Sequence, residues 1–233
     1  MGNYLARVNP LYFAALHRTA GDGDVRYWLN SVQIERHQSE GVILVATNGH
    51  VMAAMHDPEG WLHPERTTLT VQKTNRRVLS AISKRPSKGG LSPKSLWIGE
   101  RCLVLSANED TSEEPEPFGP MSLVAERSEL IVDHEPLNWR RPIPKGEDTA
   151  APWLNAQYLA LFSDIAQVLS PSKYCPGGGM RLIAGGENGA VLVRLADPDL
   201  VERFLGVIMP LRNDPLKSPH PEFMKVGEGV SPC

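Results

Sequence analysis

The sequence offers few side chains whose type and spacing suit bond-making chemistry. His50 has two acidic residues, Asp57 and Asp133, that could serve as its partner in a small hydrolase. Neither a nucleophile elbow, nor metal-ligand spacing, nor a paired-carboxylate pattern accompanies them, so we expect a non-enzymatic protein. The three cysteines are too scattered for a zinc site, and we expect no cofactor and no metal.

Basic side chains gather in one stretch of the chain. Between positions 73 and 94 there are seven basic residues and no acidic one, although the net charge of the whole chain is −3. Because salt screens charge over roughly 8 Å, a local basic surface can contact phosphates even on an acidic protein. A solvated helix surface is the alternative interpretation. The candidates for contact with phosphates are Lys73, Arg76, Arg77, Lys84, Arg85 and Lys88.

The elements that would position these residues recur along the chain. Apolar spacing predicts helices over 11–18, over 74–84 and after Asn155. Strands are predicted over 25–36, 67–71, 180–184, 190–196 and 204–211. A hairpin that turns at Gly99-Glu100 is predicted over 95–106, and a strand pair or one long strand over 122–132. Two β-type runs also flank Asn48-Gly49, which predicts a two-residue type I′ hairpin with positive φ at both residues. We interpret the pattern as three copies of strand–helix–three strands, at roughly 1–60, 61–132 and 145–212.

Composition bounds the remaining expectations. Hydrophobic residues make up 41% of the chain and charged residues 22%, which is enough apolar content for a packed core. No apolar run approaches the ~20 residues of a membrane-spanning helix, and the first residues lack a secretion signal. We therefore expect a cytoplasmic protein with no membrane partner. Residues 213–233 are rich in proline and lack periodicity, which predicts a flexible tail.

Three stretches resemble the β subunit of bacterial DNA polymerase III, the sliding clamp. The first joins 24–30 to 46–53, the second is 132–144, and the third joins 154–159 to 207–212, all in the family's order. The resemblance implies the α+β DNA-clamp fold, with antiparallel sheets outside and helices on one face. It further implies a clamp-like domain of two modules at 1–144, the equivalent of the family's middle domain. A single further module follows at 145–212.

In that family, partner proteins insert a short peptide rich in Gln, Leu and Phe into an apolar cleft between the middle and last domains. The resemblance implies such a cleft here, and replication or repair proteins as partners. Met side chains suit this role because they repack around varied ligands. Val51 and Met52 stand where the family has Arg and Leu. The matching positions are Thr47, Gly49, His50, Val51, Met52, Leu137, Pro142, Tyr158, Val207, Met209, Pro210, Leu211 and Arg212.

Two functions remain open besides the hydrolase. The first is an interaction protein, of chromosomal, phage or mobile-element origin, that tethers partners through the cleft. The second is a homo-oligomeric ring that encircles duplex DNA through backbone contacts. The family's ring holds twelve modules, so three modules per chain close such a ring only as a tetramer. A separate hypothesis is that the tail, residues 213–233, folds back and occupies the cleft.

Overall fold

The computed structural model describes residues 4–83, 90–126, 131–143, 152–169, 179–186 and 188–211. The strands are β1 (Tyr4–Val8), β2 (Ser31–Arg36), β3 (Val42–Thr47), β4 (Val51–Asp57), β5 (Trp61–Leu62), β6 (Thr68–Gln72), β7 (Ser95–Gly99), β8 (Leu103–Ser106), β9 (Ser122–Glu126), β10 (Met180–Ala184), β11 (Val191–Leu195) and β12 (Phe204–Ile208). The helices are α1 (Pro10–Leu16), the 3-10 turn η1 (Tyr27–Leu29), α2 (Arg76–Ser83) and α3 (Ala156–Leu169). No helix in these ranges has the length and apolar content needed to cross a bilayer.

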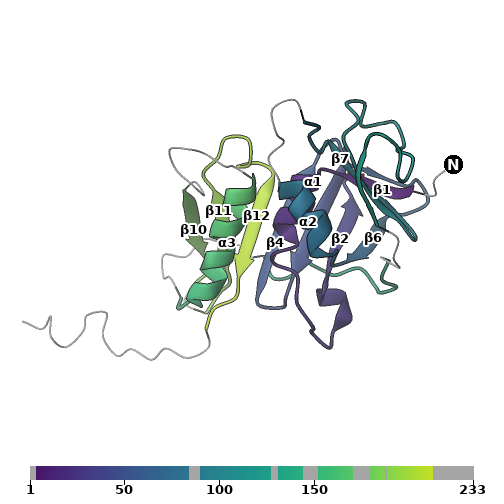
Figure 1. Ribbon diagram of the computed structural model, residues 1–233. Helices are drawn as coiled ribbons and strands as arrows, with labels where there is room; N and C mark the ends of the chain where they lie inside the picture. Colours follow the sequence, from purple (N-terminus) through teal and green to yellow (C-terminus); the bar gives the residue numbers. More distant parts are fainter. Residues whose placement is uncertain are drawn as a thin grey trace, which may run out of the picture.

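The strands form two antiparallel sheets (Figure 1). The smaller sheet has the order β5-β1-β7-β8-β9, and the larger has the order β10-β11-β12-β4-β3-β2-β6. The larger sheet joins distant parts of the sequence, because β12 pairs directly with β4 from Phe204 opposite Met55 to Ile208 opposite Val51. The C-terminal strands therefore continue the sheet that begins near the N-terminus.

The three α-helices lie together on one face of this assembly (Figure 1). α1 contacts both α2 and α3 and packs over β3 and β4, while α3 covers β12. At that contact Gly206 leaves room for the Phe162 ring, since a Cβ on Gly206 would lie only 2.4 Å from a ring carbon. One large core of buried apolar side chains fills the space between helices and sheets. The predicted α+β class, with antiparallel sheets and helices on one face, is confirmed.

The opposite face of the larger sheet carries a second, smaller apolar cluster. Alternate residues of β3 and β4 point away from the helices, as the two-residue period of a strand requires. The cluster contains Val45, Met52, Ala54 and Val207, and Trp139 from segment 131–143 packs on them. Segment 131–143 thus crosses the face that the helices leave open.

The predicted strand over 25–36 is wrong in its first half. β2 begins only at Ser31, and Val25 is 94% exposed in a loop that leads into η1. The apolar positions explain this, because Tyr27 and Leu29 are odd-numbered whereas Val32 and Ile34 are even-numbered. One continuous strand would have pointed the two pairs to opposite faces.

The predicted type I′ turn at Asn48-Gly49 is also wrong in detail. Gly49 has a φ of +87°, but Asn48 is not among the residues with positive φ. The connection from β3 to β4 has three residues, because the strands end at Thr47 and resume at Val51. The Asn48 side chain shapes it by accepting hydrogen bonds from the main-chain N–H groups of His50 and Val51, both at 3.0 Å.

The third copy of the repeat lacks its first strand in the described residues, because 152–155 precede α3 without forming one. A main-chain hydrogen bond from the Leu211 N–H to the Trp153 carbonyl joins this stretch to the residues that follow β12. Several predictions fall outside the described residues: the domain boundary at 144, the contact candidates Lys84, Arg85 and Lys88, the cleft residue Arg212, and the tail 213–233.

Candidate functional site

An apolar pocket of about 190 Å³ opens on the face of the larger sheet that the helices do not cover. Strands β3, β4 and β12 supply one side of this pocket, and segment 131–143 supplies the other. Its lining residues are Thr47, Gly49, His50, Val51, Met52, Leu137, Asn138, Trp139, Pro142, Val207 and Met209. Nine of the thirteen residues predicted for the cleft are among them.

The floor of the apolar pocket is built from two neighbouring strands. Met52 on β4 lies directly opposite Val207 on β12 in the sheet register, and both side chains are buried. The two residues are 155 positions apart in the sequence, and main-chain hydrogen bonds between the strands hold them side by side. The floor is therefore a fixed part of the sheet.

Polar side chains of β2 hold the opposite wall in place. The Leu137 N–H donates to Gln33 Oε1 at 2.7 Å, and Trp139 Nε1 donates to Glu35 Oε2 at 2.8 Å. Arg140 forms an ion pair with Glu35 at 2.8 Å and lies over the Trp139 ring at 4.1 Å. Burial raises the pKa of Glu35, but the hydrogen bonds from Arg140 and Trp139 outweigh it and leave the pKa lowered. The carboxylate thus stays ionised and anchors the wall.

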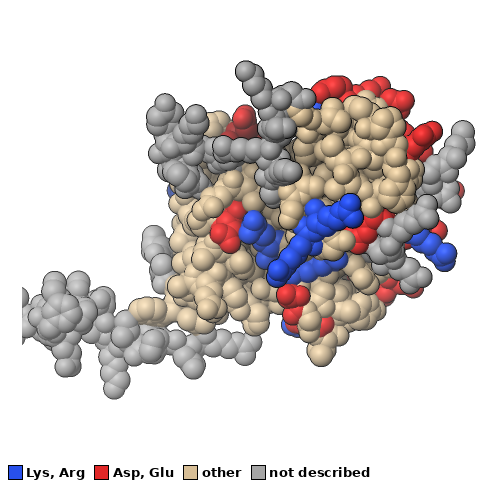
Figure 2. All heavy atoms as spheres, in the orientation of Figure 1, with Lys and Arg blue, Asp and Glu red and all other residues tan. Residues whose placement is uncertain are grey.

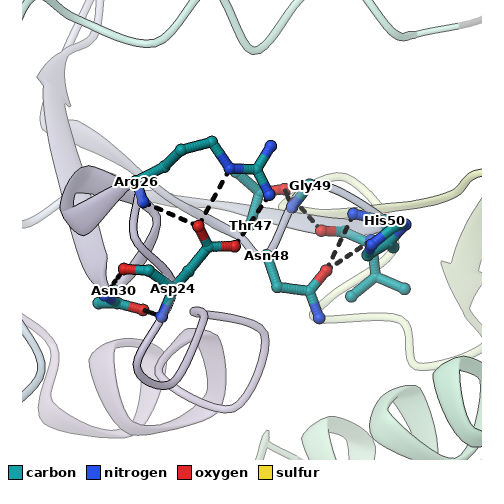
Figure 3. Close-up of polar contacts among 8 residues, drawn as sticks. Asp24, Arg26, Asn30, Thr47, Asn48, Gly49 and His50 are labelled. Atoms are coloured by element: carbon teal, nitrogen blue, oxygen red, sulfur yellow. Dashed lines mark hydrogen bonds and ion pairs between the residues drawn. The ribbon is translucent and has the colours of Figure 1, made fainter.

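The turn between β3 and β4 forms the polar rim of the pocket. Figure 3 shows the hydrogen bonds of this turn. Thr47 Oγ1 donates to the Val51 carbonyl at 2.7 Å and accepts from the Gly49 N–H at 3.0 Å. The Arg26 guanidinium lies beside Gly49, where a Cβ would approach it to 3.3 Å. Arg26 is oriented by a two-point contact with Asp24, whose pKa the Arg26 side chain lowers to about 2. A cation is thus fixed near the pocket mouth.

The other cleft residues that the structure describes, Tyr158, Pro210 and Leu211, lie around the pocket rather than in its lining. Tyr158 on α3 stacks on the His50 ring, with centroids 5.6 Å apart. Pro210 and Leu211 follow the lining residue Met209, and Leu211 is exposed together with Trp153. Exposed apolar surface therefore continues from the pocket along the end of the described chain.

The basic candidates lie on a different face. Arg76 and Arg77 are exposed on α2, Lys73 precedes that helix, and Arg18 follows α1. Figure 2 shows Lys and Arg side chains gathered over α1 and α2, on the face that the helices form. Arg18 is 3.7 Å from Asp164 of α3. The helix face is thus locally cationic beside α2.

The geometry does not support a hydrolase built on His50 and Asp57. His50 directly precedes β4 and Asp57 is the last residue of that strand, so at about 3.3 Å per residue they are separated by more than roughly 20 Å. Asp57 is also engaged elsewhere, because it accepts a hydrogen bond from the Asn9 N–H at 2.7 Å. The His50 ring, in turn, stacks on Tyr158.

Comparisons with known proteins agree with the fold. No protein-family model matches the sequence, and no curated protein matches it significantly. Solved structures do match. The DNA polymerase sliding clamp from Pseudomonas aeruginosa aligns with a TM-score of 0.54 at 16% identity, over 90% of this chain and 67% of that one. The β subunit of DNA polymerase III from Thermotoga maritima aligns with a TM-score of 0.55 at 11% identity, over 90% and 66%.

A sliding clamp from Bartonella birtlesii, solved bound to griselimycin, aligns with a TM-score of 0.55 at 13% identity, over 91% of this chain and 68% of that one. The chain therefore has the fold of the bacterial sliding clamps and spans about two thirds of their length. At these identities the likeness establishes the architecture alone. It is the fold expected for a shortened clamp-like protein.

Sequence reasoning missed two lining residues, Asn138 and Trp139, and the β2 side chains that hold them. Both lining residues lie inside the stretch 132–144, which the sequence had already singled out. The signal in the sequence was the large aromatic side chain of Trp139 between the polar residues Asn138 and Arg140. Nothing local indicated that Gln33 and Glu35, about a hundred residues earlier, would bind this stretch.

Proposed function

We infer that this protein is a non-enzymatic, clamp-like binding protein of DNA replication or repair that captures a linear peptide of a partner protein in the apolar pocket. The observation that carries the proposal is the convergence of segments 47–52, 137–142 and 207–209 on one pocket. The clamp fold supports a clamp-like role, and these segments are the ones on which the sequence resemblance rests.

The chemistry of the pocket suits a short peptide with apolar side chains. Met52, Met209 and Leu137 offer adaptable or branched apolar surface, and Trp139 adds a flat aromatic wall. The rim adds polar groups that can fix the direction of a peptide, among them His50 and the nearby Arg26. Apolar anchors with a few polar contacts are the usual means of recognising linear motifs.

Binding of a fluorescein-labelled peptide of the Gln-Leu-x-Leu-Phe type tests this proposal. We expect fluorescence anisotropy to rise with protein in the micromolar range. Met209→Ala should weaken binding about tenfold, because it removes an apolar contact worth roughly 1–2 kcal/mol. Tyr158→Ala should also weaken binding, since it removes the ring that supports His50.

Leu182→Ala is the matched control. Leu182 is 45% exposed and Met209 is 41% exposed, but Leu182 lies on β10 and does not line the pocket. This variant should bind like the parent. No rise in anisotropy at several hundred micromolar protein, or equal losses in the Met209 and Leu182 variants, would contradict peptide capture in this pocket.

A second candidate function, DNA encirclement by several chains, is favoured by the exposed Arg76 and Arg77 on the helix face. If these residues contact DNA, duplex affinity should fall with salt. The double variant Arg76→Gln/Arg77→Gln should then reduce the slope of log affinity against log salt by about 2. Arg181→Gln, on an outward-facing position of β10, is the control.

Analytical ultracentrifugation supplies the other half of this test. A sedimentation coefficient of a tetramer would favour the ring, whereas a monomer cannot encircle DNA. If the protein is a monomer, and the salt slope is the same in the parent, the double variant and the Arg181→Gln control, DNA encirclement is contradicted and only the tethering function is supported.

A further inference from the structure

A second cavity, which we call the polar cavity, lies at the other end of β4 from the apolar pocket. Its volume is about 150 Å³, roughly tenfold the space that one water molecule needs. Five separate parts of the chain meet there: the end of β1 with the start of α1, the turn after β4, the start of β7, the loop after β8, and the residue before β12. Its polar lining includes Arg7, Asn9, Tyr12, Asp57, Lys94 and Arg203.

Two of the three cations in this cavity lack an acidic partner. Lys94 pairs with Glu109 at 2.9 Å. Neither Arg7 nor Arg203 lies within ion-pair distance of a carboxylate in the described part of the chain. Arg7 donates from Nη1 and Nη2 to the main-chain carbonyls of Thr111 and Glu59, at 2.6 and 2.5 Å. It is therefore held in place by neutral main-chain groups, and the carboxylates of Asp57 and Asp110 act on its charge only from beyond ion-pair distance.

Arg203 is held far more loosely. Its Nη1 donates to the Tyr12 hydroxyl at 3.3 Å, and its side chain is exposed. A guanidinium carries five N–H donors, so most of those on Arg203 have no partner among the residues that the structure describes. The Tyr12 hydroxyl accepts this bond and keeps its own proton to donate. These donors face the same cavity as Arg7.

The cavity also contains a buried acceptor. Asp57 is 3% exposed, and its Oδ2 accepts the Asn9 N–H. Burial raises the pKa of Asp57, while the main-chain N–H groups of Asn9 and Glu59 oppose that effect. A carboxylate has about four acceptor sites, so Asp57 can accept a further hydrogen bond. The exposed Glu59 side chain also lines the cavity. A ligand of this cavity must therefore carry negative charge on the side that faces the arginines and donate a hydrogen bond to Asp57.

We propose that the polar cavity binds a phosphate group that retains a proton, either free hydrogen phosphate or the singly protonated form of a phosphate monoester, whose second pKa is about 6. Arg7 and Arg203 bind its charged oxygens, because guanidinium N–H groups match phosphate geometry. Asp57 accepts the hydrogen bond of its P–OH group. Sulfate and internal DNA phosphodiesters have no such proton at neutral pH, and the Asp57 carboxylate repels them. The site is distinct from the apolar pocket and does not depend on the peptide-binding function.

Calorimetric titration with sodium phosphate and sodium sulfate at equal ionic strength tests the site. We expect phosphate to bind at least tenfold more tightly than sulfate. Arg203→Gln should weaken phosphate binding about tenfold, since it removes one charge-assisted contact. Its melting temperature without phosphate should match the parent, because Arg203 is exposed. Arg18→Gln, which replaces an arginine beside α3, should leave phosphate binding unchanged.

Asp57→Asn adds a test of the acceptor. In this variant phosphate and sulfate should bind about equally, because the amide no longer repels sulfate. If the variant does not fold, the preference of the parent for phosphate over sulfate still decides the point. Adenosine monophosphate separates the two sources: tighter binding than inorganic phosphate assigns the site to a monoester, and weaker binding assigns it to the free ion. Equal binding of phosphate and sulfate to the parent, no binding heat, or full phosphate affinity in Arg203→Gln would overturn the proposal.

Discussion

Replacing Trp139 with alanine should destabilise the protein by about 3 kcal/mol and abolish peptide binding in the apolar pocket. The side chain is 9% exposed and packs on Met52 and Val207, so its removal leaves a cavity on the sheet. It also ends the hydrogen bond to Glu35 and the contact with Arg140, which together fix the wall of the pocket. Urea denaturation and peptide anisotropy measure the two effects.

Trp139→Phe separates packing from polar anchoring. Phenylalanine retains most of the apolar contact but cannot donate to Glu35, so we expect a loss of about 1 kcal/mol and weakened peptide binding. Peptide affinity that survives in the alanine variant would mean that segment 131–143 is not a wall of the binding site.

The second large effect concerns the buried His17 at the end of α1. Its ring is 8% exposed, and its Nε2 has no hydrogen-bond partner in the described part of the structure. Burial, and to a lesser extent the charge of Lys73, lowers its pKa from 6.5 to about 4. The unfolded chain therefore binds a proton more readily than the folded chain between these values. The free energy of unfolding should be unaffected by His17 above pH 6.5 and should fall by roughly 3 kcal/mol between pH 6.5 and 4.

Urea denaturation at half-unit pH steps, compared with His17→Gln, isolates this contribution. Glutamine has no charge at any of these pH values, so the stability of the variant should fall less steeply in this window. The raised pKa of Asp57 acts in the opposite direction in both proteins and cancels in the comparison. Parallel curves for the two proteins would show that His17 does not titrate as its burial requires.

Local patterns predicted the elements well where one signal dominated. The apolar spacing after Asn155 gave α3, and the Asn155 side chain accepts the Gln157 N–H at the start of this helix. The turn at Gly99 between β7 and β8 is also confirmed by a main-chain hydrogen bond from Gly99 to Cys102. The prediction of one strand over 25–36 was wrong because the alternation of apolar residues changes phase near Asn30. Reciprocal hydrogen bonds between Asn30 and Asp24 fold this stretch into a loop.

The site itself could not be predicted from local patterns, because it depends on pairing between distant parts of the chain. No periodicity in β4 or β12 indicates that Met52 and Val207 are neighbours, since each strand could pair equally well with another edge. Only the resemblance to sliding clamps placed these segments together. That resemblance omitted Trp139, whose position depends on an acceptor 104 residues earlier.

The pairing of β4 with β12 has a consequence for how a ligand enters. A cleft between two hinged bodies can widen when the bodies rotate, but here both sides of the floor belong to one hydrogen-bonded sheet. Because segment 131–143 is anchored to β2, adaptation to a bulky peptide must come from rotamer changes of Met52 and Met209. Association should therefore proceed at a rate set by diffusion and orientation, with no slow opening step, and differences among peptides should appear in their dissociation rates.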